Sequence, residues 1–418
     1  MNASDVLSLN VKAATFSFGS LGTFVLTLCL FAMLALFGQS QTGRRFFLAP
    51  ALTIAVGLCC ALTWRLVSGP VPPPDLSANL AAAGLSVLGF ASATQVRVSR
   101  FAKRRPTSFR LSVIAGPIYF LACVAVGIIT LPQISVTAAL LLGAALMLNG
   151  SAFDRRLVLA TAAPKSVKSV VHSESAASLV IGLPIAVLVT GYATPATLNE
   201  HALAPLLLAT ISLLKGFALG GAAGLIAAKY FIRADKPWLP AVIAAFACFT
   251  IAPILGAQPV IAVTAVGLLW GEQSSCDDRI RRLIRRKAER LVSPAAYFGF
   301  GAILGPRFYE ADLLSIFYAI AAASILRALP RAAVLKSTTF PKASQTFLAW
   351  YGGAPGAASA LFLMMLAGNA AIVDADGVLT LGALCVIAGV IAARSTAKPL
   401  LDIFLRQTAL ARRGIRPA

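Results

Sequence analysis

The stretch Leu348–Ala358 reads LAWYGGAPGAA and places Gly352, Gly353, Pro355 and Gly356 inside an apolar run long enough to span a bilayer. Glycine and proline disfavour a continuous helix at such positions. In lipid, a backbone that leaves the helix exposes N–H and C=O groups unless protein or a water-filled cavity accommodates them. The stretch therefore predicts a helix interrupted at membrane depth, and a local kink tolerated by neighbouring helices is the alternative.

A second stretch of the same kind precedes the first. Leu140–Phe153 reads LLLGAALMLNGSAF, with Asn149, Gly150 and Ser151 near the end of its apolar run. We expect a helix break at Gly150, again with a tolerated kink as the alternative. The two stretches together are more informative than either alone, because each would fall in the fifth helix of one of two six-helix repeats.

The composition indicates that the chain lies in a membrane. Of its 418 residues, 58% are hydrophobic and 12% are charged, and the mean hydropathy is +0.84. Soluble domains carry about 25% charged residues, whereas an apolar stretch of about 20 residues spans a bilayer as a helix. The sequence predicts about thirteen transmembrane helices. They are expected at residues 16–38, 47–66, 76–94, 110–130, 134–152, 174–192, 202–229, 238–255, 258–272, 291–306, 312–328, 345–367 and 377–394.

We expect an all-α polytopic membrane protein with a single transmembrane domain over residues 1–418. Two inverted six-helix repeats, about 16–192 and about 238–394, would flank a linker helix at about 202–229, with a cytoplasmic tail at 395–418. The discontinuous helices then are the fifth and the twelfth, each the fifth helix of its repeat. Inverted repeats with broken helices are found in many secondary transporters.

The charge distribution predicts the orientation of the chain. The formal net charge is +21, and the 36 Lys and Arg residues gather in alternate connections between the expected spans, with four exceptions: Lys12, Arg65, Lys215 and Arg307. This is the positive-inside bias, so the N-terminus is expected outside and the C-terminus in the cytoplasm. The placement favours a bacterial inner (plasma) membrane protein over a nucleic-acid-binding protein.

Several other functions find no support in the sequence. The seven cysteines fall within expected spans or on the cytoplasmic side, so a disulfide framework is not expected. The sequence holds no GxxxxGK[ST] phosphate loop, which argues against an ATP-driven pump. No expected span presents a nucleophile with a base or a metal-ligand cluster, so we expect neither an enzyme nor a cofactor or metal.

Two further segments carry unusual patterns. Asp277–Val292 reads DDRIRRLIRRKAERLV, which predicts an interfacial helix lying on anionic lipid headgroups, with a basic regulatory site as the alternative. In the expected seventh span, Gly216, Gly220 and Gly224 form a small-residue stripe that predicts close packing within the chain, or a dimer contact. Lys215 in the same span is an intramembrane charge and hence a candidate functional residue.

The order and spacing of several segments resemble the monovalent cation:proton antiporters, in their bacterial thirteen-helix sodium/proton exchanger branch. The stretch AAAGLSVLGFASATQVRVSRFAKRR resembles that family's third helix, LPQISVTAALLLGAALMLNGSA its fifth and HSESAASLVIGLP the start of its sixth. GAQPVIAVTAVGLLWG resembles the ninth, SILRALPRAAVL the eleventh and LAWYGGAPGAASALFLMML the twelfth. The resemblance covers most of the chain in pattern.

The resemblance implies a homodimeric carrier that exchanges a monovalent cation, sodium or potassium, for protons by alternating access. In that family the sixth helix carries a glutamate followed by an Asn-Asp pair, whose aspartate binds proton and cation in turn. Here the glutamate is kept as Glu174 and is followed by Ser175. The Asn-Asp pair falls on Ser178 and Leu179.

Other positions also depart from the family. Its Thr-Asp pair on the fifth helix falls on Gly150 and Ser151, and an acidic residue late in the third helix corresponds to Gln95. The Gly-Pro-Arg-Gly of its twelfth helix reads Gly-Ala-Pro-Gly at 353–356, without the arginine. Glu174 is expected at the cytoplasmic end of the sixth span, and no acidic residue near the middle of any span. This pattern is that of a neutralised site.

The candidate ion-binding residues share oxygen or amide groups that can ligate a cation or hydrogen-bond a polar solute. They are Glu174, Ser175, Ser178, Asn149, Ser151 and Gln95. Cation:proton antiport with Glu174 as its acid is the first interpretation. The alternatives are an uncoupled facilitator or a carrier of another solute, and a membrane interaction protein that transports nothing.

Overall fold

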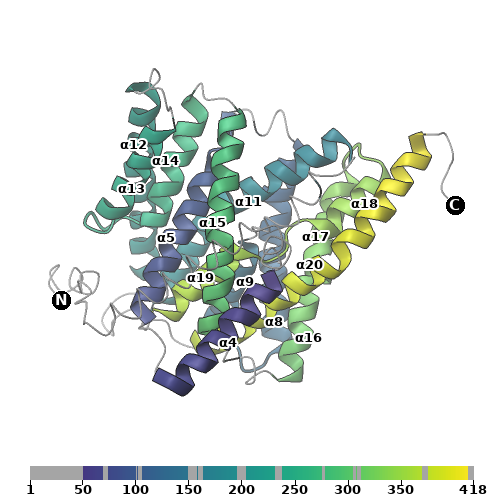
Figure 1. Cartoon of the computed structure of the whole chain (residues 1–418), viewed down its shortest axis with the longest axis horizontal. Helices are drawn as coiled ribbons and strands as arrows, with labels where there is room; N and C mark the ends of the chain where they lie inside the picture. Colours follow the sequence, from purple (N-terminus) through teal and green to yellow (C-terminus); the bar gives the residue numbers. More distant parts are fainter. Residues whose placement is uncertain are drawn as a thin grey trace.

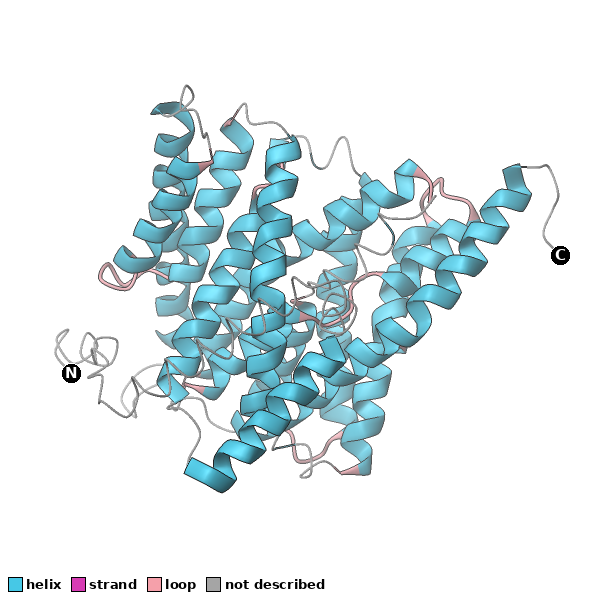
Figure 2. Ribbon diagram, viewed as in Figure 1, coloured by secondary structure: helices cyan, strands magenta, loops and turns pink. Residues whose placement is uncertain are grey.

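The computed structural model describes residues 50–68, 74–99, 101, 106–148, 158, 163–194, 204–230, 238–274, 278–304, 307, 312–369 and 375–412. Within them the regular elements are helices and no strand is present (Figure 2). The helices are α4 (Pro50–Ser68), α5 (Pro74–Ala93), α7 (Pro106–Arg110), the π-helical turn η1 (Leu111–Ala115), α8 (Gly116–Thr130), α9 (Val136–Met147), α11 (Lys165–Ala193), α12 (Ala204–Tyr230), α13 (Leu239–Ile251), α14 (Pro259–Gln273), α15 (Asp278–Leu304), α16 (Leu313–Ala323), α17 (Ile325–Lys336), α18 (Lys342–Tyr351), α19 (Ala357–Ala367) and α20 (Ala375–Arg412).

Each expected span from the second to the thirteenth has a helix at its position, and the first, 16–38, lies outside the described residues. Among the described residues, five helical segments are long and apolar enough to cross a membrane: Pro106–Thr130, Lys165–Ala193, Ala204–Lys229, Leu313–Lys336 and Asp376–Ala393. The polytopic all-α class is therefore confirmed. The count of thirteen stays a prediction, as do the repeat boundaries.

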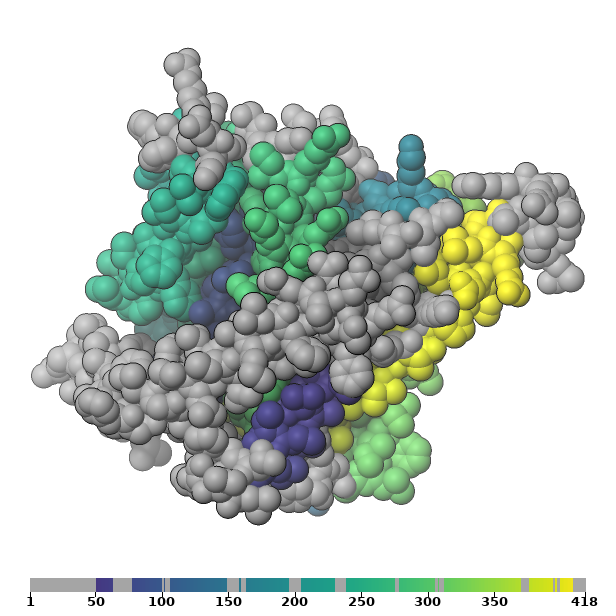
Figure 3. Space-filling view, in the orientation of Figure 1, coloured from purple at the N-terminus to yellow at the C-terminus, as the bar shows by residue number. Residues whose placement is uncertain are grey.

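The helices form two groups on either side of α9 and α11. Figure 1 shows α12, α13 and α14 at one side of the molecule and α16, α17, α18 and α20 at the other. Helix α5 packs against α14 and α15, and α15 also packs against α4 and α19. In the space-filling view of Figure 3, α15 (green) and α20 (yellow) reach the same face. The largest apolar cluster draws its residues from α5, α9, α11, α15, α19 and α20.

The glycine stripe of α12 packs within the chain. A Cβ added to Gly220 would overlap the backbone carbonyl of Ala262 on α14, and one added to Gly224 would overlap that of Val266. The absence of side chains therefore lets the two backbones approach closely, as small residues do between membrane helices. This confirms the packing interpretation of the stripe.

The twelfth expected span is interrupted as predicted. Helix α18 ends at Tyr351 and α19 begins at Ala357, which leaves the glycine and proline cluster between them. Gly353 has φ of +78°, in the left-handed region that glycine adopts without steric cost.

The two stretches singled out in the sequence meet in space. Helix α9 ends at Met147, and Asn149, Gly150 and Ser151 lie outside the described residues. The hydroxyl of Ser359, in the first turn of α19, donates a 2.6 Å hydrogen bond to the carbonyl of Leu148. The end of one interrupted helix is thus joined to the start of the other.

The described part of the basic segment 277–292 is not a separate helix, and its contact with anionic lipid headgroups stays a prediction. Its described residues are the first half of α15, which continues without a break to Leu304. The face of this half that packs inward carries Arg281, Arg285 and Glu289, all less than 10% exposed. These side chains are tolerated there because they find acceptors and a counter-charge inside the protein.

Candidate functional site

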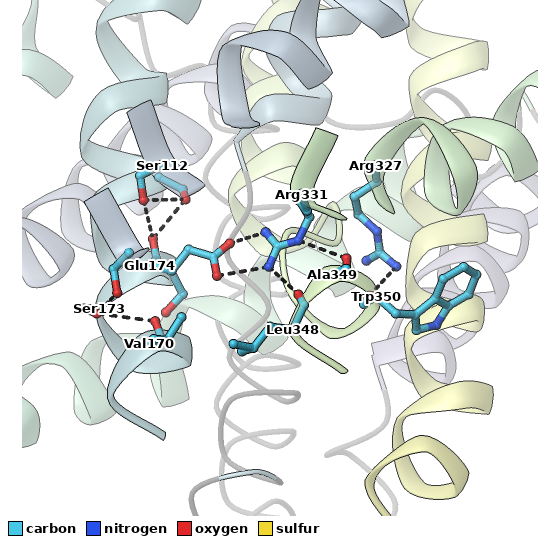
Figure 4. Close-up of polar contacts among 12 residues, drawn as sticks. Ser112, Val170, Ser173, Glu174, Arg327, Arg331, Leu348, Ala349 and Trp350 are labelled. Carbon is cyan, nitrogen blue, oxygen red and sulfur yellow. Dashed lines mark hydrogen bonds and ion pairs between the residues drawn. The ribbon is translucent and has the colours of Figure 1, made fainter. Parts of the chain in front are cut away.

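Glu174 lies in the third turn of α11 and is buried, with 3% of its surface exposed. Both of its carboxylate oxygens accept hydrogen bonds from Arg331 of α17, Oε1 from Nη1 and Oε2 from Nη2 at 3.0 Å (Figure 4). Two parallel bonds between a guanidinium and a carboxylate are the strongest form of this contact. The site therefore keeps both signs of charge, and the expectation of a neutralised site is wrong.

The same arginine also binds the broken end of α18. Arg331 donates from Nε to the carbonyl of Ala349 at 3.1 Å and from Nη2 to that of Leu348 at 2.8 Å. Arg327, one turn earlier on α17, donates to the carbonyl of Trp350 at 3.0 Å and lies 5.9 Å from its ring centre (Figure 4). A helix that ends within a membrane leaves its last carbonyls without partners and its C-terminus partially negative. The two arginines satisfy three of those carbonyls and offset that charge.

Gly352 makes room for this arrangement. A Cβ at this position would overlap the guanidinium of Arg331. The glycine directly after α18 therefore has a steric role beside its part in ending the helix. The interruption of the twelfth span, the arginine cap and Glu174 form one connected unit across α11, α17 and α18.

Hydroxyl groups line the opposite side of Glu174. Ser178 donates to the Glu174 carbonyl at 2.9 Å and lies 3.4 Å from Ser112, in the π-helical turn η1 (Figure 4). One turn away, the hydroxyls of Ser108 and Ser173 are 2.7 Å apart. All four serines are buried. Single π-helical turns are frequent at functional sites, and this one turns Ser112 toward α11.

A second buried arginine contacts α11 from α15. Arg285 donates from Nη1 to the carbonyl of His172 at 3.1 Å and from Nη2 to the hydroxyl of Ser175 at 2.8 Å. Its Nε donates to Glu289, four residues later on its own helix, at 2.9 Å. Glu174 and Ser175 therefore point to different neighbours, one toward α17 and the other toward α15.

The remaining predicted site residues are not joined to Glu174 by a described contact. Gln95, just after α5, donates to its neighbour Thr94 at 3.2 Å. Asn149 and Ser151 lie outside the described residues. Lys215 is exposed on α12, and its Nζ donates at 3.4 Å to the carbonyl of Leu255 in the turn after α13.

Sequence reasoning missed Arg331, Arg327, Arg285, Glu289 and Ser112. Arg285, Glu289 and Arg331 fall in connections between the expected spans, and Arg327 falls at the end of the expected span 312–328. The stretch SILRALPRAAVL nevertheless carried a signal. Arg327 and Arg331 are four residues apart, so on a helix they lie on the same face. Ser112 carried no signal, since a π-helical turn leaves no pattern in sequence spacing.

The arrangement presents one carboxylate paired with a guanidinium, and serine hydroxyls around the backbone carbonyl of the same residue. A carboxylate, a backbone carbonyl and hydroxyls are the ligands that hard monovalent cations use, and a carboxylate also accepts a proton. Among the described residues no group of His, Cys, Asp and Glu could hold a resident metal ion.

Comparisons with known proteins agree with this geometry. Residues 32–402 match the transmembrane family of sodium/hydrogen exchangers. A structure of the sodium proton antiporter MjNhaP1 from Methanocaldococcus jannaschii at pH 8 has a TM-score of 0.68 and 17% identity, over 94% of this chain and 96% of that chain. Another structure of that antiporter, an electron microscopy map, has a TM-score of 0.60 and 15% identity, over 95% and 97%. At these identities the likeness shows the fold, and the sequence matches no curated protein.

Proposed function

The chain belongs to the sodium/hydrogen exchanger family and so to the secondary cation:proton antiporters, and from this premise we propose that Glu174 is the carboxylate at which its cation and proton compete. The observation that carries the proposal is the buried contact of both Glu174 oxygens with Arg331. This contact supports a buried site between α11 and α17, beside the end of α18. This chain lacks the other acidic residues of the family's ion-binding motifs, so Glu174 alone would serve as the acid.

Arg331 is suited to release Glu174 when another cation arrives. Its bonds to the Leu348 and Ala349 carbonyls remain when the carboxylate is taken by a proton or a monovalent cation. The guanidinium is therefore not left without partners, which would be costly in a buried position. The partially negative end of α18 also continues to offset its charge.

The serines supply neutral ligands for the incoming cation. A cation bound at Glu174 would lose its water shell, and the hydroxyls of Ser112 and Ser178 with the Glu174 carbonyl offer oxygens in its place. This proposal keeps Ser178 from the expected ion-binding set and adds Ser112. It supports a small monovalent cation, sodium or potassium, as the substrate.

A single carboxylate also sets the stoichiometry. Glu174 carries one negative charge, so each half of the cycle moves either one proton or one monovalent cation. Exchange is then one for one and moves no net charge. Alternating access between the two sides of the membrane follows from the interrupted helices meeting at one site.

The test is flux in proteoliposomes. A pH gradient is imposed, sodium, potassium or lithium is added in turn, and internal pH is followed for the wild type, Glu174→Gln and Asp402→Asn. Asp402 is an exposed acid on α20 and serves as the matched control. Cation-dependent proton release that is lost in Glu174→Gln and kept in Asp402→Asn is the expected result. Release retained by folded Glu174→Gln would exclude Glu174, and no release from the wild type would exclude antiport altogether.

Orientation and assembly belong to the same proposal. The positive-inside bias supports an outer N-terminus and a cytoplasmic C-terminus in a bacterial inner membrane. The exposed face of α15 carries Arg279, Arg282, Arg286, Lys287 and Arg290, which supports contact with anionic lipid headgroups. The family resemblance supports a homodimer. Protease accessibility of a tag at each terminus, and lipid and subunit counts by native mass spectrometry, would test these points.

A further inference from the structure

Arg285 bridges helices α15 and α11. It lies on α15 with 3% of its surface exposed, and its guanidinium reaches across to α11. There it donates to the carbonyl of His172 and the hydroxyl of Ser175. Ser175 in turn donates to the same His172 carbonyl at 3.2 Å. The three groups form a closed set of hydrogen bonds at the residue next to Glu174.

The charge of Arg285 is balanced on its own helix. Glu289 accepts from Arg285 at 2.9 Å, and the two side chains are 4% and 8% exposed. The two α11 atoms that Arg285 reaches, a carbonyl and a hydroxyl oxygen, are neutral. If α11 moved away from α15, the ion pair of Arg285 with Glu289 would stay intact on α15. The described contacts of Arg285 with α11, which would have to break, are hydrogen bonds to neutral acceptors.

The contact between α11 and α17 differs from the contact between α11 and α15. Glu174 and Arg331 carry opposite charges on two different helices, α11 and α17. Separating these helices would leave the buried Glu174 carboxylate without its counter-charge, which costs far more than breaking hydrogen bonds to neutral groups. Of the two contacts, the one between α11 and α15 is therefore the less costly to break.

We propose that Arg285, the His172 carbonyl and the Ser175 hydroxyl form a releasable latch that holds α11 against α15 in this conformation and opens during each transport cycle. The proposal rests on the exchange function proposed above and concerns its regulation. It gives Ser175 a different role from the ion ligand expected from sequence. The Ser175 hydroxyl accepts a hydrogen bond from Arg285 and donates one to the His172 carbonyl, so it takes part in the latch both as an acceptor and as a donor.

The decisive variant is Ser175→Ala, because it removes one acceptor of Arg285 and leaves every charge in place. One hydrogen bond from a charged donor is worth about a tenfold change in an equilibrium. We expect the maximal exchange rate in proteoliposomes to rise several-fold, with the half-saturating cation concentration changed far less. Backbone amides of the 165–176 segment should exchange hydrogen several-fold faster in the purified protein. Arg285→Lys keeps the charge but loses the planar guanidinium that reaches both α11 acceptors. It should also raise the maximal exchange rate and the hydrogen exchange of the 165–176 segment.

The matched control is Arg281→Lys. Arg281 is buried on the same face of α15 one turn earlier, and it donates to Ser274 at 2.9 Å instead of to α11. The Arg281→Lys variant should leave the hydrogen exchange rates of the 165–176 backbone amides unchanged. The double variant Ser175→Ala/Arg285→Lys should have an effect no greater than the larger single effect, because both remove the same contact.

Three results would overturn the latch. The first is a raised half-saturating concentration with an unchanged maximal rate in Ser175→Ala, which is the mark of an ion ligand. The second is unchanged hydrogen exchange in the 165–176 segment. The third is additive effects in the double variant. Hydrogen exchange does not require transport, so it tests the latch even if the wild type shows no antiport and the proposed function fails.

Discussion

Glu174 of α11 and Arg331 of α17, which are 157 residues apart in the chain, form a two-point ion pair in the interior of the protein. Breaking such a pair by neutralising one partner strands the other charge and costs about 3–5 kcal/mol. Arg331→Gln should therefore lower the thermal unfolding temperature in detergent markedly. The double variant Glu174→Gln/Arg331→Gln should recover much of that loss, because no charge is left unpaired. A double variant as unstable as the sum of the single variants would contradict a direct pair.

Gly352→Ala should disturb the same pair without changing any charge. The new Cβ would overlap the Arg331 guanidinium and push it from the Leu348 and Ala349 carbonyls. We expect cation-dependent proton flux to fall at least about tenfold, as when a positioned group is displaced. Gly377→Ala is the control, since its Cβ would meet nothing within 4 Å. Equal flux in the two variants would exclude a steric role for Gly352.

Ser359→Ala should weaken the junction between the two interrupted helices. The change leaves the buried carbonyl of Leu148 without the hydroxyl of Ser359, and such a loss costs about 1–3 kcal/mol. The expected outcome is a lower unfolding temperature. Ser395→Ala, on an exposed position of α20 where the hydroxyl bonds its own helix, is the comparison and should change little. A Ser359 variant as stable as the Ser395 variant would argue against the junction.

Two adjacent glycines of α12 offer a paired test of helix packing. Gly220→Ala places a methyl group against the Ala262 carbonyl and should destabilise the protein, whereas the nearest atom to a Cβ at Gly221 is 3.9 Å away. Gly221→Ala should be neutral or stabilising, because alanine is favoured over glycine in a helix by about 1 kcal/mol. Unfolding temperatures of the two variants decide the point. The packing interpretation fails if both respond alike.

Lys215→Met should leave exchange intact. Lys215 is exposed, and its contact is with the Leu255 carbonyl in the turn after α13, on the opposite side of the molecule from α17 (Figure 1). A residue that takes no part in the Glu174 site should not alter the half-saturating cation concentration or the maximal rate. Flux measured beside the wild type is the check. Lost coupling in folded protein would place Lys215 in the transport cycle.

The order of helices and the interruption at 352–356 could be predicted because their signals are local. Apolar length marks a membrane helix, and clustered glycine and proline mark its break. The Ser359–Leu148 hydrogen bond joins the end of α9 to the start of α19, and so connects the two stretches that the sequence singled out.

The charges of the site could not be predicted from the positive-inside bias. That bias assigns charged residues near the end of an apolar run to the connections between helices. Arg331 and Glu289 lie only a few residues beyond the expected spans, yet α17 and α15 continue through them. Helix α17 extends beyond the end of the expected span 312–328, and α15 begins before the expected span 291–306. The pairing of Arg331 with Glu174 depends on how α17 and α11 pack, which one sequence does not state.

The position of Arg331 in the chain has a consequence for biogenesis. Glu174 is synthesised and inserted long before its partner, and the N-terminal parts of a chain fold first. Until α17 follows, a nascent chain holds an acid in the membrane with no arginine beside it, which is an unfavourable state. The arginines themselves precede α18, so its broken end meets its caps as soon as it is made. Formation of the ion pair thus waits for the synthesis of α17, which ends the period in which the Glu174 carboxylate lacks its counter-charge.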